Sequence, residues 1–431
     1  PPSRAICGRN SRFRSDRAPT EGLTDRPGEL ASMTRDDDSG RDATDSDDLL
    51  ELDGAAGGGQ LLRTALALSM VADRPFRMTN IRGDRPTPGL KSQHLTAVEA
   101  AAEVCDAEVE GAARGAEKLT FRPGSPTGGE RESAERESRR TTFDGGRVEA
   151  DIGTAGSITL LFDTLLPVAV GLDRPLAVAA TGGTDVKWSP SMAHYRRVKL
   201  PLLREAGLLA TVECDRSGFF PAGGGEATLW LAPASRSDLT ELDLTAPGDL
   251  DGVRIHSKES ADLADRDVAA RQAASARERL RAGEDDTVSD ERSVPDEISV
   301  TEETRSSVGT SSPGSALAVV LDYEKTTVGF DALGEKGKPA EAVGREAAER
   351  AVEFRRRIEE YDSTAVAPAV DAHTADQLVV VLALAGGRVA IPEVTAHVRT
   401  CVDLVGEFGF EVAIEEDGDG PPVLTAPNAG N

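Results

Sequence analysis

One pattern recurs three times along this chain: an amphipathic helix, a small turn and then a strand. The copies span Leu95–Glu110, Val198–Cys214 and Val398–Ile414. In each copy helical spacing of apolar residues gives way to alternation, at Asp106, Gly207 and Gly409, where we expect the helix to end. Repeated helix–strand units predict an α+β protein made of small layers of sheet and helix.

A separate region lies between the second and third copies. Residues 239–362 hold two helical patterns, at 261–281 and 340–359, and a strand pattern at 316–321, so we interpret this region as an inserted domain. The core of the protein is then expected at residues 48–238 and 363–431.

Three polar segments carry no periodic apolar pattern. They are residues 1–47, Gly124–Gly146 and Ala282–Ser315, which are rich in charged and small side chains. Such segments bury too little apolar surface to offset the loss of chain entropy, so we expect an extension and two insertions without structure.

The composition is acidic and poor in lysine. The chain has 75 Asp and Glu against 49 Lys and Arg, a formal net charge of -26. This balance is typical of a protein from a salt-rich, halophilic cytosol, although acidic tails on an ordinary protein are the alternative. Because phosphate binding needs basic groups, any contact with a nucleic acid must come from local arginines. High salt would also weaken a long phosphate footprint, which favours recognition of a nucleic-acid end over recognition of a duplex.

The cysteines and the apolar runs exclude several classes of protein. Four scattered cysteines form no C-x-x-C pair, so neither a metal site nor a disulfide scaffold is indicated, and a cytoplasmic location is expected. Asp163 interrupts the best apolar run, so no membrane span or membrane partner is predicted.

A glycine-rich turn follows the first strand pattern. Leu52–Gln60 reads LDGAAGGGQ and leads into an apolar helix. Bare glycines let backbone N–H groups approach a phosphate, and a helix N-terminus favours negative charge. The turn lacks the Gly-Lys-Ser/Thr of a Walker loop, and a tight turn with no ligand is an equal reading.

A second candidate segment, Asn80–His94, presents two arginines in a loop stiffened by prolines. The guanidinium groups of Arg82 and Arg85 match phosphate oxygens, and Gln93 and His94 follow at a helix start. The alternative is a surface loop whose arginines pair with carboxylates. Two further glycine-rich segments, 180–185 and 218–226, are either turns or parts of a site.

Histidine is rare, and its placement is regular. Of the five histidines, His94, His194 and His397 each lie just before the helix of one repeat. A capping role is the ordinary interpretation, but the repeated position suggests a shared anion-binding surface. A positive helix end also favours the neutral imidazole, which is the nucleophilic form.

Together these motifs resemble the RNA 3′-terminal phosphate cyclase family, over about residues 49–424. The segments that carry the resemblance are ELDGAAGGGQLLRTALALS, NIRGDRPTPGLKSQHLTAVEAAAEV, ATGGTD, GFFPAGGGE, HTADQLVVVLALAG and the His397-x-x-Thr400 segment. The resemblance implies three βαβαββ repeats, like the C-terminal domain of a bacterial translation initiation factor, with a smaller α/β domain inserted before the last.

The resemblance also implies a reaction that uses ATP and Mg²⁺ or Mn²⁺ on RNA 3′-phosphate ends. A histidine takes AMP from ATP, passes it to the RNA 3′-phosphate, and the neighbouring 2′-hydroxyl then closes a 2′,3′-cyclic phosphate. Position by position, the nucleophile corresponds to His397. The residues that correspond to the nucleotide-binding positions are Arg63, Arg82, Arg85, Gln93, His94, Pro190, His373, Asp376 and Gln377. Among them, His373 and Pro190 correspond to the two faces of the adenine site.

One departure from the family concerns the metal. Relatives carry a glutamate in the first glycine loop that helps to hold the divalent ion, but here the loop is shorter and Ala56 stands in its place. Where relatives commonly have glutamine, this chain has Asp163, and we hypothesise that it restores the missing carboxylate.

Two other functions are compatible with the repeat architecture. A non-catalytic, cyclase-like factor that binds RNA during ribosome assembly would lack the nucleophilic histidine, so His397 argues against it, although the missing glutamate argues weakly for it. An enolpyruvyl transferase would need a basic pocket for phosphoenolpyruvate, which the sequence does not indicate.

Overall fold

The structure is a computed structural model that describes residues 49–124, 142–282, 299–361, 366–416 and 420–428. All of these belong to one compact unit, residues 46–431. The predicted extension, 1–47, lies outside the described residues. No helix among the described residues has the length and apolar character needed to cross a membrane.

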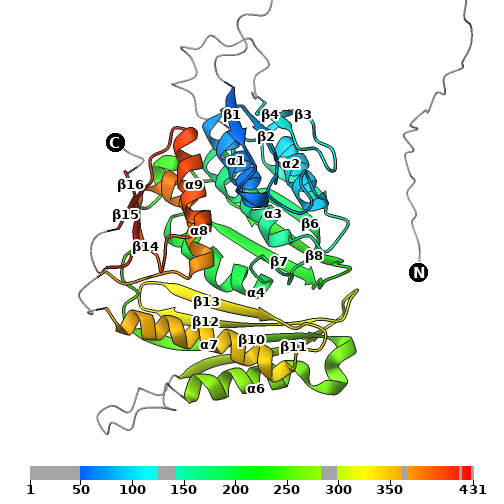
Figure 1. Ribbon diagram of the computed structural model, residues 1–431, viewed down its shortest axis with the longest axis vertical. Helices are drawn as coiled ribbons and strands as arrows, with labels where there is room; N and C mark the ends of the chain where they lie inside the picture. Colours follow the sequence, from blue (N-terminus) through cyan, green and yellow to red (C-terminus); the bar gives the residue numbers. More distant parts are fainter. Residues whose placement is uncertain (1–48, 125–141, 283–298, 362–365, 417–419, 429–431) are drawn as a thin grey trace, which may run out of the picture. The chain divides into compact units, whose positions relative to one another are not determined.

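The first part of the chain forms a four-stranded sheet with two helices (Figure 1). Its elements are β1 (Leu50–Asp53), α1 (Gly58–Ala72), β2 (Phe76–Thr79), α2 (Ser92–Cys105), β3 (Glu108–Glu110) and β4 (Leu119–Arg122). The strand order is β1-β2-β4-β3, with β1 and β2 parallel and the other pairs antiparallel.

The second part repeats this order of strands. Its elements are β5 (Gly146–Asp151), α3 (Ile158–Leu165), a 3₁₀ helix (Leu166–Gly171), β6 (Leu176–Gly182), α4 (Met192–His194), a π-helix (Tyr195–Lys199), α5 (Leu200–Glu205), β7 (Ala210–Arg216) and β8 (Gly225–Leu231). The sheet has the order β5-β6-β8-β7, again with the first pair parallel. A 3₁₀ turn (Arg236–Asp238) follows.

The third sheet has the same order but is assembled from distant segments. It consists of β9 (Leu242–Leu244), β14 (Gly387–Ala390), β15 (Ala413–Glu415) and β16 (Val423–Ala426), in the order β9-β14-β16-β15. Its helices are α8 (Ala372–Ala385) and α9 (Ala396–Glu407). Because β9 and β14 are parallel neighbours, the chain leaves this sheet after β9 and returns to it more than a hundred residues later.

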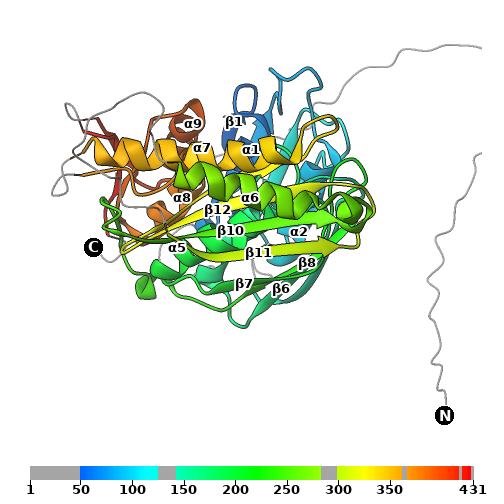
Figure 2. The ribbon, with the colours of Figure 1, turned by 90° about the horizontal axis from the view of Figure 1, so that it is seen from below.

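The intervening region has a sheet and a core of its own. It comprises β10 (Leu250–Ser260), a 3₁₀ helix (Ala261–Arg266), α6 (Val268–Arg281), β11 (Val300–Val308), β12 (Ser315–Tyr323), β13 (Thr327–Leu333) and α7 (Ala340–Glu359). The strand order is β11-β10-β12-β13. Helices α6 and α7 lie side by side on one face of this sheet (Figure 2), and their alanine-rich faces bury against it in a separate apolar cluster.

The predicted α+β class is confirmed. In each of the three helix–strand copies, the helix ends where the sequence indicates. Asp106, Gly207 and Gly409 all have positive φ, of 50°, 86° and 83°, which stops a right-handed helix. The strands β3, β7 and β15 follow each of them. A large apolar cluster runs through all three sheets and their helices, from Leu52 to Leu424.

Two predicted boundaries are wrong. The insert does not begin at residue 239, because Leu242–Leu244 forms strand β9 and pairs with β14 in the third sheet. This strand was missed because three residues are too few to show an alternating pattern in the sequence. The segment Ala282–Ser315 is not wholly without structure, because Val300–Val308 is the edge strand β11. Strand β11 needs backbone hydrogen bonds from only one neighbour and buries little, so its sequence is polar.

Smaller differences concern the two other segments. The helix expected at 261–281 starts only at Val268, because Asp267 has a left-handed backbone with a φ of 50° and separates it from a 3₁₀ turn. In the segment Gly124–Gly146, Gly146 already belongs to β5, and residues 125–141 lie outside the described residues.

Candidate active site

A cavity of about 800 Å³ lies where helices of all three sheets meet the inserted region. The predicted residues that line it are Arg63, Asp163, Pro190, His373, Asp376, Gln377 and His397. Arg82, Arg85, Gln93 and His94 do not line it. The predicted set therefore divides into a cavity group and a second group, which lies around the glycine-rich turn.

Helix α8 brings three of the cavity residues together, and a buried aspartate fixes its start. Oδ1 of Asp371 accepts hydrogen bonds from the backbone N–H groups of His373 and Thr374, at 3.0 and 2.9 Å, so Asp371 is the N-cap. His373, Asp376 and Gln377 follow within the next turns. The cap thus sets the direction in which the helix presents these side chains.

The same aspartate meets a histidine from the second sheet. Nε2 of His194 lies 3.4 Å from Oδ2 of Asp371, and both side chains are only 4% exposed. Burial alone would lower the pKa of His194, but Asp371 and the nearby Asp331 outweigh it and raise the pKa. His194 therefore faces a buried carboxylate, although it lines the same cavity as His397. The anion-binding surface expected for His94, His194 and His397 stays a prediction.

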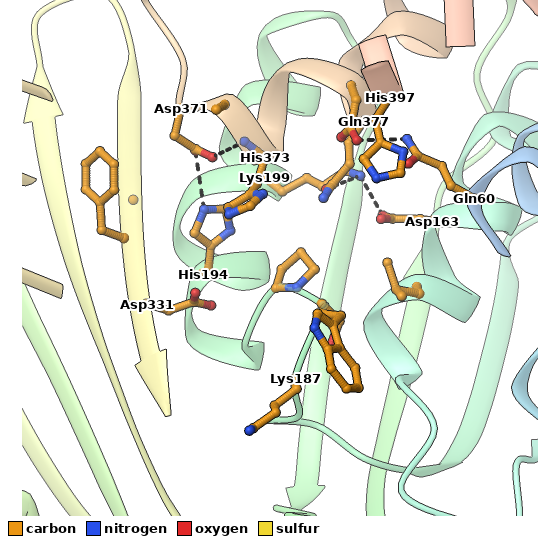
Figure 3. A pocket seen from close by; sticks show the side chains of 18 of the residues that line it. Gln60, Asp163, Lys187, His194, Lys199, Asp331, Asp371, His373, Gln377 and His397 are labelled. Carbon is orange, nitrogen blue, oxygen red and sulfur yellow. Dashed lines mark hydrogen bonds and ion pairs between the residues drawn. The ribbon is translucent and has the colours of Figure 1, made fainter. Parts of the chain in front are cut away.

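His397 lies in the first turn of α9, and its side chain is exposed to the cavity. Oγ1 of Thr395 caps this helix by accepting the N–H of Val398 at 3.2 Å. The imidazole is consequently held at the positive end of the helix, where an anion is favoured. Figure 3 shows the ring of His397 next to the amide of Gln60, at the opposite end of the view from Lys187.

Gln60 connects the glycine-rich turn to this end of the cavity. Its Nε2 donates to Oδ2 of Asp376 at 2.8 Å, which joins α1 to α8. Burial raises the pKa of Asp376, while the hydrogen bond from Gln60 and the nearby His397 oppose the rise. The carboxyl group is therefore easier to protonate than an ordinary aspartate.

A buried lysine lies beside the remaining carboxylate. Nζ of Lys199 is 2.7 Å from Oδ1 of Asp163 and donates to Oε1 of Gln377 at 2.9 Å, with only 3% of the lysine side chain exposed (Figure 3). Lys199 thus orients Gln377 and balances the charge of Asp163. Sequence reasoning missed Lys199; the signal was a lysine within the apolar run Val198–Leu203 of a chain that has few lysines.

The second group surrounds the glycine-rich turn. A Cβ atom at Gly59 would lie 2.2 Å from Nε2 of His94 and 3.1 Å from Nη1 of Arg63, and one at Gly58 would lie 2.9 Å from Nη2 of Arg85. Three basic side chains therefore converge on backbone that only glycine leaves accessible. The helix α1 starts at these glycines, and its N-cap, Gly57, provides no side-chain cap for the first N–H groups.

The histidine of this group is held in one neutral form. Burial, together with Arg63, Arg82 and Lys91, lowers the pKa of His94 to about 3. The backbone N–H of Lys91 can only donate, and it lies 3.1 Å from Nδ1 of His94. The single ring proton is therefore assigned to Nε2, which lies close to Gly59 of the glycine-rich turn and 3.4 Å from Nε2 of Gln93.

The other two members of the group support the loop. Nη1 of Arg82 donates to the carbonyl groups of Thr87 and Gly89, both at 2.8 Å, so part of this guanidinium shapes its own loop. Oε1 of Gln93 accepts the N–H of Ser157 at 3.3 Å, which joins α2 to α3. Arg63 is the link between the groups, because it lines the cavity and also approaches Gly59.

Within the described ranges, protein side chains alone do not form a metal site. No group of three or more histidine, cysteine or acidic side chains with suitable placement occurs in the part of the chain that the structure describes. Asp163, the predicted ligand, already faces the ammonium of Lys199. Its role as a metal ligand stays a prediction, and no chemical step below depends on a metal.

Comparison with known proteins is consistent with this geometry. The sequence model of the family described as RNA 3′-terminal phosphate cyclase matches residues 55–414. Proteins named RNA 3′-terminal phosphate cyclase are similar to the chain in Halobacterium salinarum, with 43% identity over 87% of this chain and 99% of that protein, and in Pyrococcus furiosus, with 36% identity over 84% and 94%. A third, from Saccharolobus solfataricus, is 34% identical over 86% and 98%.

Proposed function

Because the chain belongs to the RNA 3′-terminal phosphate cyclase family, we propose that it converts an RNA 3′-phosphate into a 2′,3′-cyclic phosphate at the expense of ATP, with His397 as the nucleophile. The observation that carries the proposal is the position of His397. It is an exposed imidazole on a positive helix end, in a cavity that Arg63 connects to the glycine-rich turn. The name of the family supports an RNA 3′-phosphate as the substrate.

In the first step, we propose, a ring nitrogen of His397 attacks the α-phosphorus of ATP. A phosphorus–nitrogen bond forms, and the bond to the leaving pyrophosphate breaks. The N–H groups at the start of α1, with Arg63, Arg85 and His94, are suited to hold the phosphates, because all three side chains point at the same glycines. Neutral His94 contributes an Nε2–H donor without adding charge.

The adenosine would occupy the cavity between α8 and the loop before α4. His373 is exposed and can stack on one face of the adenine, while Pro190, whose carbonyl group is tied to Oγ1 of Thr159 at 3.0 Å, would cover the other face. Asp376 and Gln377 are held by Gln60 and Lys199 and offer polar contacts. A bound Mg²⁺ or Mn²⁺ would supply charge neutralisation at the phosphates.

In the following steps AMP passes from His397 to the RNA 3′-phosphate, forming a phosphoanhydride. The neighbouring 2′-hydroxyl then attacks this activated phosphorus, and AMP leaves with the electron pair of the broken bond. We also propose that the three sheets are copies of one βαβαββ repeat with an inserted domain after β9, because their element and strand orders coincide.

Incubation with ATP labelled at the α-phosphate tests the proposal. We expect the protein to become labelled and to release the label as AMP when RNA with a 3′-phosphate is added. His397→Asn should abolish labelling, while His256→Asn, which changes a histidine outside the cavity, should retain it. An unlabelled wild-type protein that still binds RNA would instead support the non-catalytic factor.

A further inference from the structure

Trp188 is the most exposed large apolar side chain of the described residues, with 94% of its surface accessible, and it lines the cavity that contains His397. Its φ is 63°, a left-handed value that is strained for a bulky residue. An exposed indole in a strained backbone stabilises the fold little. The exposure of Trp188 and its left-handed backbone are therefore better explained by binding than by stability.

The residues on both sides of Trp188 are fixed in place. Nζ of Lys187 pairs with Glu335 at 2.9 Å, and Oγ of Ser189 donates to the carbonyl group of Val186 at 3.0 Å. The N–H of Ser191 donates to Oδ2 of Asp331 at 2.6 Å. Glu335 and Asp331 belong to the inserted region, so the loop is held by core and insert together. The loop that carries the indole therefore contacts both parts of the protein.

The cavity that Trp188 lines is also lined by basic groups from α7. Arg350 and Arg357 are seven residues apart, so they lie on one face of the helix, and both line the cavity. Arg350 contacts Glu346 at 3.6 Å and its Nη2 donates to the carbonyl oxygen of Asp331, but its Nε is buried without a hydrogen-bond partner. Arg357 is exposed and makes no ion pair with any residue that the structure describes. N–H groups of these two guanidinium groups can donate hydrogen bonds to phosphate oxygens.

We propose that Trp188 is the platform on which a base at the 3′-end of the RNA stacks, with Arg350 and Arg357 contacting the phosphates behind it. An aromatic face next to basic side chains is the usual way to hold single-stranded nucleic acid without reading its sequence. This inference rests on the proposed function and adds to it: the substrate must have an unpaired 3′-end. The inserted region then supplies the RNA side of the cavity, and His397 the ATP side.

The chain itself offers a reporter, because it has only two tryptophans, Trp188 and Trp230. Trp230 lies on β8, outside the cavity. In a Trp230→Phe variant, fluorescence comes from Trp188 alone. We expect an oligonucleotide with a 3′-phosphate to quench this fluorescence saturably. An oligonucleotide that keeps the 3′-phosphate but lacks the last two bases should quench it much less.

Two outcomes of this titration would overturn the proposal. One is equal quenching by the oligonucleotides with and without terminal bases, or none by either. The other is equally strong quenching by ATP alone, which would make adenine the base that stacks on Trp188. Because the titration measures binding and the labelling experiment measures adenylylation, failure of this inference is distinguishable from failure of the proposed function.

Kinetics supply a second test. Trp188→Ala should raise the KM for RNA by roughly 5- to 100-fold, as expected for one lost stacking contact, and should change the KM for ATP far less. Trp188→Phe should recover most of the loss, because phenylalanine restores an aromatic face. A purely structural role would change both KM values together. Arg357→Gln should weaken RNA binding and reduce its salt dependence by about one phosphate contact.

Discussion

Nζ of Lys199 lies 2.7 Å from Oδ1 of Asp163 in the lining of the cavity, with 3% and 13% of the two side chains exposed. The two charges compensate each other, and Asp163 also interacts with the buried guanidinium of Arg63. Breaking such a pair by removing one partner leaves an uncompensated buried charge, whereas removing both is often well tolerated. This relationship decides how substitutions at the predicted metal ligand must be interpreted.

Lys199→Met should lower the free energy of unfolding by up to about 3 kcal/mol, because Asp163 loses its ion-pair partner and keeps only the interaction with Arg63. The double variant Lys199→Met/Asp163→Asn should recover most of this loss. Denaturant unfolding measures both, with Lys118→Met, at an exposed lysine, as the control. Similar stabilities of single and double variants would mean that the pair is solvated in solution.

The metal role of Asp163 needs a different measurement. If Asp163 contacts the divalent ion, Asp163→Asn should raise the Mg²⁺ concentration that gives half-maximal self-adenylylation, and the shift should persist in the double variant. An unchanged requirement in both variants would leave Asp163 as the counter-ion of Lys199 alone.

The His194–Asp371 pair predicts a pH-dependent contribution to stability. Because the pKa of His194 is higher in the folded state than in the unfolded state, protonation of His194 stabilises the fold. This contribution is complete below the unfolded-state pKa of 6.5 and is lost as the pH rises through the folded-state pKa. The pKa of Asp371 is lowered to about 2, since His194 and Thr374 outweigh the effect of burial, so its contribution is present above 3.8. Charged groups facing His194 are Asp371, Asp331 and Lys199. The pair is therefore strongest between about pH 4 and pH 6.5.

Thermal unfolding of wild type and His194→Gln over this range measures the effect. The difference in Tm should be largest near pH 5 and should shrink as the pH rises above 6.5. A difference that stays constant from pH 5 to pH 9 would show that His194 contributes by packing and not by charge.

The two nitrogens of His94 have separable roles. His94→Asn keeps an acceptor for the N–H of Lys91 but loses the donor at Nε2, whereas His94→Gln can place an amide N–H near that donor position. We expect His94→Asn to fold normally and to bind ATP more weakly, by about tenfold for one lost hydrogen bond to a charged group. His94→Gln should retain more of the affinity. Calorimetric titration with ATP compares them; the reverse order would place the phosphates elsewhere.

The sequence predicted the parts of the fold that local patterns encode. Helix ends at Asp106, Gly207 and Gly409 were readable because a left-handed residue must follow a helix that turns into a strand. Strand β9 could not be predicted from the sequence, because its three residues form a strand only by pairing with β14, on the other side of the insert. The polar edge strand β11 was missed for a similar reason, since its pairing with β10 is long-range.

The candidate site shows the same division. The cavity residues of α8 and α9 were predicted because they stand in recognisable segments at helix starts. The contribution of the insert was not predicted, since Asp331, Arg350 and Arg357 come from different elements that only the tertiary structure brings to Trp188. The contact of His194 with Asp371 was not predicted, because the two residues are far apart in sequence.

A methyl group added at Gly59 should impair the phosphate site and leave the stability of the fold nearly unchanged. In Gly59→Ala the added Cβ would lie 2.2 Å from Nε2 of His94, so the ring must move away from the glycine-rich turn, although the backbone at Gly59 has no positive φ. We expect self-adenylylation to fall at least tenfold while the Tm changes little. Gly406→Ala is the matched control, because a Cβ there meets no atom within 4 Å, and this helical position should be stabilised slightly. Normal labelling in Gly59→Ala would show that neither His94 nor the turn contacts the phosphates.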